Sequence, residues 1–186
     1  MRVIAGALKG RQLKAPKWEG LRPTSDKLRE TLFNVLAARV PAARVLDGYA
    51  GTGAVGIEAL SRGAAHVTFL EQDRRAAALI EENLSRCGVE NGYVIIRAPV
   101  GRAVAALHAD PAFVPFDIIL LDPPYDQPPS GVLTDVGSHD RLLAPGGILV
   151  LEHARRERSP ETAGRLARTR LLTSGDSALS FYACQP

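Results

Sequence analysis

The sequence predicts an α/β domain whose sheet is mostly parallel, with an antiparallel last strand. Three observations support this fold class. Short apolar and β-branched runs alternate with longer helical segments across the 186 residues, as in βαβ units. A glycine-rich turn follows the first expected strand, and the polar segment Asp122-Pro123-Pro124-Tyr125 follows the fourth. Polar motifs at strand ends are typical of Rossmann-like domains, which bind ligands there.

Seven strands are expected, each a short apolar or β-branched run. The fifth is entered from the turn Pro145-Gly146-Gly147. The last two have no helix between them, so they should form an antiparallel hairpin at one edge of the sheet. The expected strands are residues 44–47, 66–71, 93–97, 117–122, 147–153, 168–172 and 178–183.

Two of the intervening helices have clear end signals. Asp73 can cap a helix over residues 74–86, and Gly88 can end it, because glycine readily adopts the left-handed conformation of a helix terminus. Gly63 likewise ends the helix that begins near Gly53. The strands and helices therefore follow one another in the order that a right-handed βαβ crossover requires.

Residues 1–40 are expected to form an N-terminal extension that packs on a core domain of residues 41–186. Glycines divide residues 1–22 into an extended or hairpin-like segment. Either Thr24 or Ser25 can cap a following helix. The apolar face of that helix, which would pack on the core, is Leu28, Leu32, Val35 and Leu36.

Charge is unevenly distributed along the chain, although the net value is only +3. Residues 1–30 carry eight basic and three acidic side chains (+5), residues 31–154 nine and fourteen (−5), and residues 155–186 six and three (+3). Basic ends around an acidic middle favour a polyanionic partner, with nucleic acid first among them.

Composition also narrows the cellular setting. No apolar run approaches the roughly 20 residues that a membrane span needs. The two cysteines are too few and too scattered for a disulfide framework or a zinc site. A cytoplasmic protein that does not bind membranes is therefore expected.

The turn from Asp47 to Gly56 is typical of a cofactor-binding loop. Gly51, Gly53 and Gly56 have the spacing of the dinucleotide fingerprint, and Glu71 lies 20 residues after Gly51 (71 − 51). One interpretation is a cofactor with a pyrophosphate, as in nicotinamide or flavin enzymes. Another is S-adenosylmethionine, with the carboxylate accepting from the ribose hydroxyls in either case. A glycine turn that binds no ligand is the third.

Asp47 favours S-adenosylmethionine. A carboxylate just before the glycines would repel a pyrophosphate but would attract the methionine ammonium, directly or through water. The Asp122-Pro123-Pro124-Tyr125 segment agrees, because acceptors, stiff prolines and a stacking ring suit an amine-bearing planar base. Hydride transfer has no use for such a clamp. No metal-ligand spacing appears, and none of the four histidines is needed for catalysis.

Further motifs run nearly from end to end of the chain. They are Arg2-Val3-Ile4-Ala5-Gly6, Lys9-Gly10-Arg11, Arg22-Pro23-Thr24-Ser25-Asp26, Ala50-Gly51-Thr52-Gly53, Leu60-Ser61-Arg62-Gly63-Ala64, Asp122-Pro123-Pro124-Tyr125 and Asp176-Ser177-Ala178-Leu179-Ser180-Phe181-Tyr182. With these motifs the chain resembles the RsmD family of class I, Rossmann-like methyltransferases. That family methylates the exocyclic N2 of a guanine in small-subunit (16S) ribosomal RNA.

The resemblance implies a set of site residues and partners. The cofactor is S-adenosylmethionine, the product is S-adenosylhomocysteine, and no metal takes part. The implied cofactor-binding residues are Asp47, Tyr49, Ala50, Gly51, Gly53, Glu71, Gln72 and Val100. Asp122 and the Pro123 carbonyl would accept the amine hydrogens, Pro124 would stiffen the turn, and Tyr125 would stack on the base.

The expected partner is ribosomal RNA, either free or in an assembling or assembled small subunit, bound by a monomer. The expected RNA-binding residues are Lys9, Arg11, Lys14, Arg22 and Thr24, followed by Arg155, Arg156 and Arg158.

The chain departs from the family at one position, and its motifs are also compatible with two other functions. Pro99 stands where many relatives have an aspartate for the adenine amine, so apolar packing and the Val100 backbone should hold adenine, with ordinary to weak affinity. An adenine-N6 methylase acting on nucleic acid is compatible with the Asp122-to-Tyr125 segment. An NAD-dependent oxidoreductase would use Gly51, Gly53 and Gly56.

Overall fold

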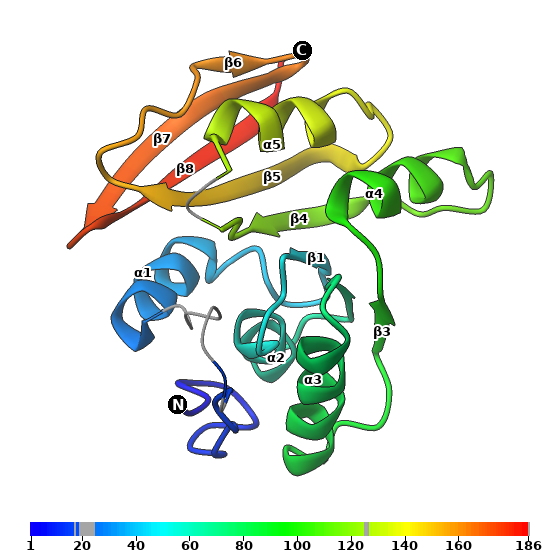
Figure 1. Ribbon diagram of the computed structural model, residues 1–186, viewed down its shortest axis with the longest axis vertical. Coiled ribbons are helices and arrows are strands. Elements are labelled where there is room, and N and C mark those ends of the chain that lie inside the picture. Colours follow the sequence, from blue (N-terminus) through cyan, green and yellow to red (C-terminus); the bar gives the residue numbers. More distant parts are fainter. Residues whose placement is uncertain (17, 19–24, 125–126, 186) are drawn as a thin grey trace.

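The structure is a computed structural model that describes residues 1–16, 18, 25–124 and 127–185. These residues form one sheet of eight strands in the order β3-β2-β1-β4-β5-β8-β7-β6 (Figure 1). The strands are β1 (Arg44–Gly48), β2 (His66–Leu70), β3 (Tyr93–Ile96), β4 (Phe116–Leu121), β5 (Leu143–Ala154), β6 (Thr162–Ala163), β7 (Leu166–Ser174) and β8 (Ser177–Cys184).

The Rossmann-like α/β prediction is confirmed, with one correction to the strand count. Strands β1 to β5 pair in parallel, and β8 pairs antiparallel with β5 and with β7, as expected for the last two strands. The prediction of seven strands missed β6, whose two residues pair with β7 at the sheet edge. A strand of two residues has too little alternation for a sequence pattern to reveal it.

The strand order changes direction between β1 and β4, which lie side by side although two strands, β2 and β3, separate them in sequence order. Gly48 pairs with Leu121 at their carboxyl ends. Consequently the residues after β1 and those after β4 open on the same crevice, where doubly wound sheets bind ligands.

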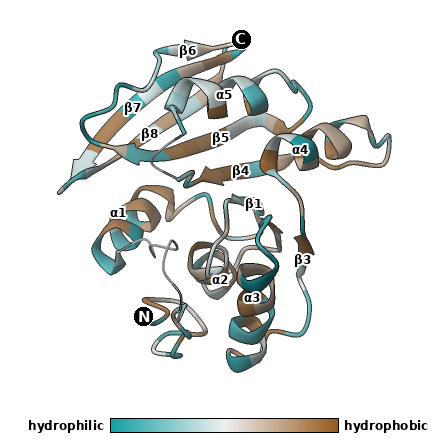
Figure 2. Cartoon of the chain, in the orientation of Figure 1, coloured by the Kyte–Doolittle hydropathy of each residue, from teal (hydrophilic) through white to brown (hydrophobic). Residues whose placement is uncertain are grey.

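Helices cover both faces of the sheet (Figure 1). Helices α1 (Asp26–Leu36), α2 (Ala54–Ser61) and α3 (Arg74–Arg86) contribute buried residues to one hydrophobic cluster. Helices α4 (Val100–Ala109) and α5 (Pro129–Gly137) contribute to the other. Figure 2 shows strands β4 and β5 as largely hydrophobic and the outer helix surfaces as hydrophilic. Sheets with two covered faces are built from such apolar strands.

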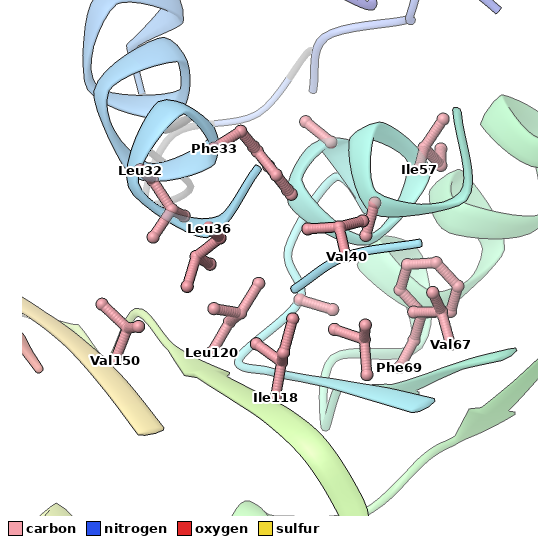
Figure 3. Packing of buried hydrophobic residues seen from close by; sticks show 14 of the residues in the cluster. Leu32, Phe33, Leu36, Val40, Ile57, Val67, Phe69, Ile118, Leu120 and Val150 are labelled. Carbon is pink, nitrogen blue, oxygen red and sulfur yellow. The ribbon is translucent and has the colours of Figure 1, made fainter. Parts of the chain in front are cut away.

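Helix α1 packs on the sheet largely through its predicted face: Leu28, Leu32 and Leu36 are buried, but Val35 is only half-buried, and Phe33, which the prediction left out, is buried. Leu32, Phe33 and Leu36 are at most 5% exposed, and Leu32 and Leu36 point toward Leu120 and Val150 of the sheet (Figure 3). The helix begins after Ser25, whose Oγ accepts from the Leu28 backbone N–H at 3.2 Å. Of the two predicted caps, Ser25 is therefore the one observed.

The predicted N-terminal hairpin is present in residues 1–16. Arg2 and Gln12 form an antiparallel bridge, and the Val3 N–H donates to the Arg11 carbonyl at 3.0 Å. Val3 and Leu13 are buried in the same cluster as α1. The hairpin therefore belongs to the core of the fold and is more than a surface appendage.

Three buried polar side chains fasten this hairpin to α2 and α3. The Glu58 carboxylate accepts from the Ile4 and Ala5 N–H groups at 2.7 and 3.0 Å. Ser61 accepts from the Leu8 N–H at 2.9 Å. Asn83 exchanges hydrogen bonds with the backbone of Lys14 and also donates to the Thr52 carbonyl at 2.9 Å. Asn83 thus ties the hairpin directly to the glycine turn.

Among the described residues, the helices include none that is long and apolar enough to cross a membrane.

Candidate active site

A cavity of about 520 Å³ lies at the carboxyl ends of β1, β2, β4 and β5. This is within the roughly 300–1,000 Å³ that is usual for small-molecule sites. Its described lining combines Ser25, Lys27, Leu28, Asp47, Tyr49, Ala50, Gly51, Thr52, Ala54, Val55, Leu70, Glu71, Gln72, Ala98, Val100, Asp122, Pro123, Pro124, Glu152, Ser174, Gly175, Asp176 and Ser177. The glycine turn and the Asp122-Pro123-Pro124 segment therefore share one cavity, as the sequence required.

The glycine turn owes its shape to residues with positive φ. Gly51 and Gly53 have φ of 55° and 74°, and Tyr49 adopts φ 62° despite its side chain, which is uncommon for an aromatic residue. The Tyr49 hydroxyl donates to Gln127 Oε1 at 3.0 Å, which holds the ring at the cavity wall. Burial raises the pKa of Tyr49 to about 12, so this hydroxyl stays protonated.

Glu71 braces this turn from the end of the neighbouring strand. One carboxylate oxygen accepts from the Gly51 N–H at 2.9 Å, and the other accepts from the Asp73 N–H at 2.8 Å. The side chain is only 8% exposed and lines the cavity. Each carboxylate oxygen has a second lone pair, so Glu71 can hold the turn and still accept from a ribose diol.

Asp47 is the most buried acid of the cavity, at 4% exposure. Its carboxylate accepts from the Gly56 N–H at 2.8 Å, inside the first turn of α2. Burial raises the pKa of Asp47 to about 8; the Gly56 hydrogen bond opposes this rise, and the nearby Asp122 and Glu71 carboxylates add to it. A bound cation would stabilise the charged form.

The same contact argues against a dinucleotide cofactor. A pyrophosphate binds at the free N–H groups of the helix N-terminus that follows the glycines. Here the Asp47 carboxylate occupies the Gly56 amide of that turn. A pyrophosphate would meet an acid instead of donors, so the oxidoreductase interpretation is disfavoured.

The second and third glycines of the apparent fingerprint serve packing. A Cβ on Gly56 would lie 2.2 Å from Phe69 Cε1, and one on Gly53 would lie 3.1 Å from Ile80. Gly53 caps α2, and neither glycine is among the described residues that line the cavity. Of the predicted cofactor glycines, Gly51 alone reaches it.

The remaining predicted cofactor residues lie as follows. Ala50 and Gln72 line the cavity, the first buried and the second exposed. Val100 is 5% exposed and lines the wall beside Ala98. Pro99 stands between them as the exposed residue before α4 and is not part of the described lining. An apolar wall of Ala98 and Val100 suits a flat purine.

The opposite wall follows β4. Asp122 lies directly after the strand, and its N–H donates to the Gly48 carbonyl at 3.3 Å. Pro123 is buried and Pro124 is exposed, and all three residues line the cavity. Tyr125 lies outside the described residues. The structure thus places the acid and both prolines of the predicted amine clamp in the same cavity as the glycine turn.

Sequence reasoning missed two parts of this wall. Glu152 of β5 lines the cavity at 8% exposure, and the β7–β8 turn (residues 174–177) closes the side beyond it. Glu152 ends an apolar run, Leu149-Val150-Leu151, just as Asp122 ends its own. That parallel between the two strand ends was the available signal.

The predicted RNA-binding residues are spread over two regions. Lys9 and Arg11 are exposed on the hairpin, whereas Lys14 is paired with Glu82 at 2.6 Å. Arg22 and Thr24 lie outside the described residues. Arg155, Arg156 and Arg158 are exposed after β5, where the Arg155 N–H donates to the Asp176 carbonyl of the cavity wall at 2.7 Å.

The chain is similar to several known proteins. A family model described as conserved hypothetical protein 95 matches residues 1–183. The chain is 37% identical over 182 residues to a Bacillus subtilis protein named putative rRNA methyltransferase YlbH, covering 98% of each. It is 42% identical over 155 residues to ribosomal RNA small subunit methyltransferase D of Haemophilus influenzae, covering 82% of this chain and 78% of that protein.

A solved structure shows the same fold. The putative methyltransferase yhhF from Escherichia coli has a TM-score of 0.82 and 31% identity, with 100% of this chain and 98% of that chain covered.

Proposed function

This chain belongs to the RsmD family of methyltransferases, and from that premise we propose that it methylates the exocyclic N2 of a guanine in small-subunit ribosomal RNA. One observation carries the proposal. The glycine turn and the Asp122-Pro123-Pro124 segment line the same cavity. A methyl donor and an amine-bearing base can therefore bind side by side for direct methyl transfer.

The cofactor half of the cavity fits S-adenosylmethionine. Asp47 would face its ammonium, Glu71 its ribose hydroxyls, and Ala98 and Val100 its adenine. When bound, S-adenosylmethionine supplies a methyl carbon on a sulfonium, and the C–S electron pair stays with sulfur as S-adenosylhomocysteine forms. The buried acids of the chain favour this cation because they lie where water screens charge poorly.

The target half prepares the nucleophile. The lone pair of guanine N2 is delocalised into the ring, so the amine must be aligned before it can attack. The Asp122 carboxylate and the Pro123 carbonyl accept hydrogen bonds from the two amine hydrogens. These hydrogen bonds localise electron density on the nitrogen. After the N–C bond forms, the nitrogen loses one proton, which is acidic enough to leave to solvent without a dedicated base. Catalysis then rests on positioning and electrostatics.

The proposal extends to the partners of the protein, first of all to the RNA. The N-terminal extension of residues 1–40 presents Lys9 and Arg11 to RNA phosphates. The protein acts as a monomer and without a metal ion. The target guanine must be exposed or flipped to enter the cavity, as in a loop of structured RNA.

The experiment compares nucleosides of ribosomal RNA from cells with and without this gene, by mass spectrometry. Loss of N2-methylguanosine, restored by the wild-type gene but not by an Asp122→Ala variant, is the expected result. Loss of N6-methyladenosine instead would establish the adenine methylase, which the amine clamp also allows. An unchanged nucleoside profile would reject both.

A further inference from the structure

Asp122, directly after β4, and Glu152, near the end of β5, lie at corresponding positions of two adjacent parallel strands. Leu121 of β4 pairs with Leu151 of β5, so the next residue of each strand is Asp122 and Glu152. Neighbouring strands lie about 4.8 Å apart. Both acids, with Asp47, line a small recess under α1 together with the apolar residues Leu28, Leu32, Leu120, Val150 and Leu179. Two carboxylates thus stand side by side on the target wall.

Glu152 is a buried acid in the wall of the cavity. It is 8% exposed, lies beside apolar side chains and shares its cavity with four further acids, Asp47, Glu71, Asp122 and Asp176. Burying a carboxylate among apolar groups and like charges is costly. Acids kept in such places line functional sites more often than average.

We propose that Glu152 selects guanine by accepting the N1–H of the target base, an inference that rests on the proposed function. On guanine the reactive amine is flanked by N1, which carries a hydrogen, and by N3, which carries a lone pair. With the amine held at Asp122, a carboxylate beside it attracts N1–H and repels N3. Glu152 therefore fixes both the identity and the orientation of the base.

The same contact rejects adenine. Adenine also has an exocyclic amine that Asp122 could hold, but its N1 is an acceptor. Its lone pair would face the Glu152 carboxylate in a buried site. A site built to bond a substrate N–H rejects an analogue that lacks it by about 10⁴–10⁵-fold. Glu152 is thus a specificity residue that touches the base, whereas Asp122 governs the attack.

The test uses small-subunit ribosomal RNA that carries guanine or 2-aminopurine at the methylated position. 2-Aminopurine keeps the N2 amine but has an acceptor at N1. The wild-type protein should methylate guanine at least about 10³-fold faster than 2-aminopurine. Glu152→Gln should narrow this gap to about tenfold or less, because an amide can also donate to N1. The Asp122→Ala variant should lose about 10³-fold in rate on either RNA.

Glu157→Gln is the matched control. Glu157 is half-buried in the turn after β5 and lies outside the described cavity lining, so its variant should keep the wild-type gap. If Glu152→Gln keeps the wild-type ratio of the guanine rate to the 2-aminopurine rate, even with a lowered melting temperature, then Glu152 has a structural role and the inference is overturned. A second measurement needs no variant: wild-type protein should not methylate N1-methylguanine at the target, and turnover there would overturn the inference as well.

Failure of this inference differs from failure of the proposed function. If the wild-type protein transfers no methyl group to guanine in the RNA, the proposed function is wrong. If it methylates guanine but discriminates equally with Gln at position 152, only the role of Glu152 is wrong.

Discussion

The two halves of the cavity are held in place by different means. In the cofactor half, the buried acids Asp47 and Glu71 are bonded to backbone N–H groups of the turn that they shape. In the target half, Asp122 and Glu152 belong to separate strands, and stiff prolines set the backbone. The cofactor half is therefore organised by local hydrogen bonds and the target half by strand register.

This difference predicts how each half responds to substitution. A side chain of the cofactor half supports backbone as well as ligand, so its loss should change affinity and stability together. A side chain of the target half touches the base, so its loss should change turnover or selectivity with little effect on cofactor affinity. The following predictions test this separation.

The largest effect is expected at Asp122. Asp122→Ala should lower kcat for methyl transfer by about 10³-fold, the scale for losing a preorganised electrostatic group. The dissociation constant for S-adenosylhomocysteine, measured by calorimetry, should change by less than about threefold because no cofactor role is assigned to Asp122. A large loss of cofactor affinity would mean that the two halves are not separable.

Asp47 should give the next largest effect. Asp47→Asn should weaken S-adenosylmethionine binding by roughly 10–100-fold, since a hydrogen bond to a charged group is worth about 1.5–3 kcal/mol. With a pKa near 8 in the free protein, Asp47 should also lose its proton on binding the cation. Calorimetry at pH 6.5 in two buffers should detect release of about one proton. The Asp47→Asn variant should release no proton. If the wild-type protein gives the same binding heat in both buffers, the proposed contact is contradicted.

The pKa of Asp47 also sets the pH dependence of folding in the absence of ligand. Folding raises the pKa of Asp47 from its ordinary 3.8 to about 8. Between these two pH values the folded state therefore retains a proton that the unfolded chain loses. The contribution of the protonated Asp47 to the stability of the folded state is complete below pH 3.8 and is lost as the pH rises through about 8. The free energy of unfolding should fall by up to about 1.4 kcal/mol per pH unit in that window. In Asp47→Asn, urea titrations should show a flatter profile.

Gly56 tests whether the glycines of the cofactor half serve packing. Gly56→Ala should lower the free energy of unfolding by about 1–3 kcal/mol, because the new Cβ would overlap Phe69. Gly131→Ala in α5 is the matched control, since a Cβ there meets only Pro128 at 3.8 Å. That variant should be neutral or more stable by up to about 1 kcal/mol. If Gly56→Ala is equally well tolerated, the packing argument fails.

The smallest effects are expected on RNA affinity. Lys9→Ala and Arg11→Ala should each weaken binding severalfold and reduce the slope of log affinity against log salt by about one. Lys14→Ala should change the slope less, because Glu82 already partly neutralises that ammonium. Filter binding at several salt concentrations measures these slopes. Equal changes of slope for all three variants would mean that the Lys14–Glu82 ion pair breaks when RNA binds.

The sequence revealed the parts of this site that are local in the chain. The turn, Asp47 and Glu71 lie within one βαβ unit, so spacing alone located them. Asp122 was found because prolines follow it directly. Glu152 was missed because the acid after the apolar run Leu149-Val150-Leu151 gains its meaning only from the register of β5 against β4.

Two other features also depended on long-range contacts. The packing roles of Gly53 and Gly56 follow from Ile80 and Phe69, which belong to other elements. A fingerprint motif therefore matched in spacing while two of its glycines served a different purpose.

The attachment of the hairpin through Glu58 restricts how this protein can be altered. That carboxylate is fully buried, and two of its hydrogen-bond donors, the Ile4 and Ala5 amides, come from the first five residues. Deleting those residues would remove two of the hydrogen-bond donors of a buried carboxylate and leave it only its contact with Arg62 among those described. Any graft of a different RNA-binding arm onto this catalytic body would have to supply two amides at the same place, so the arm and the body are not interchangeable parts.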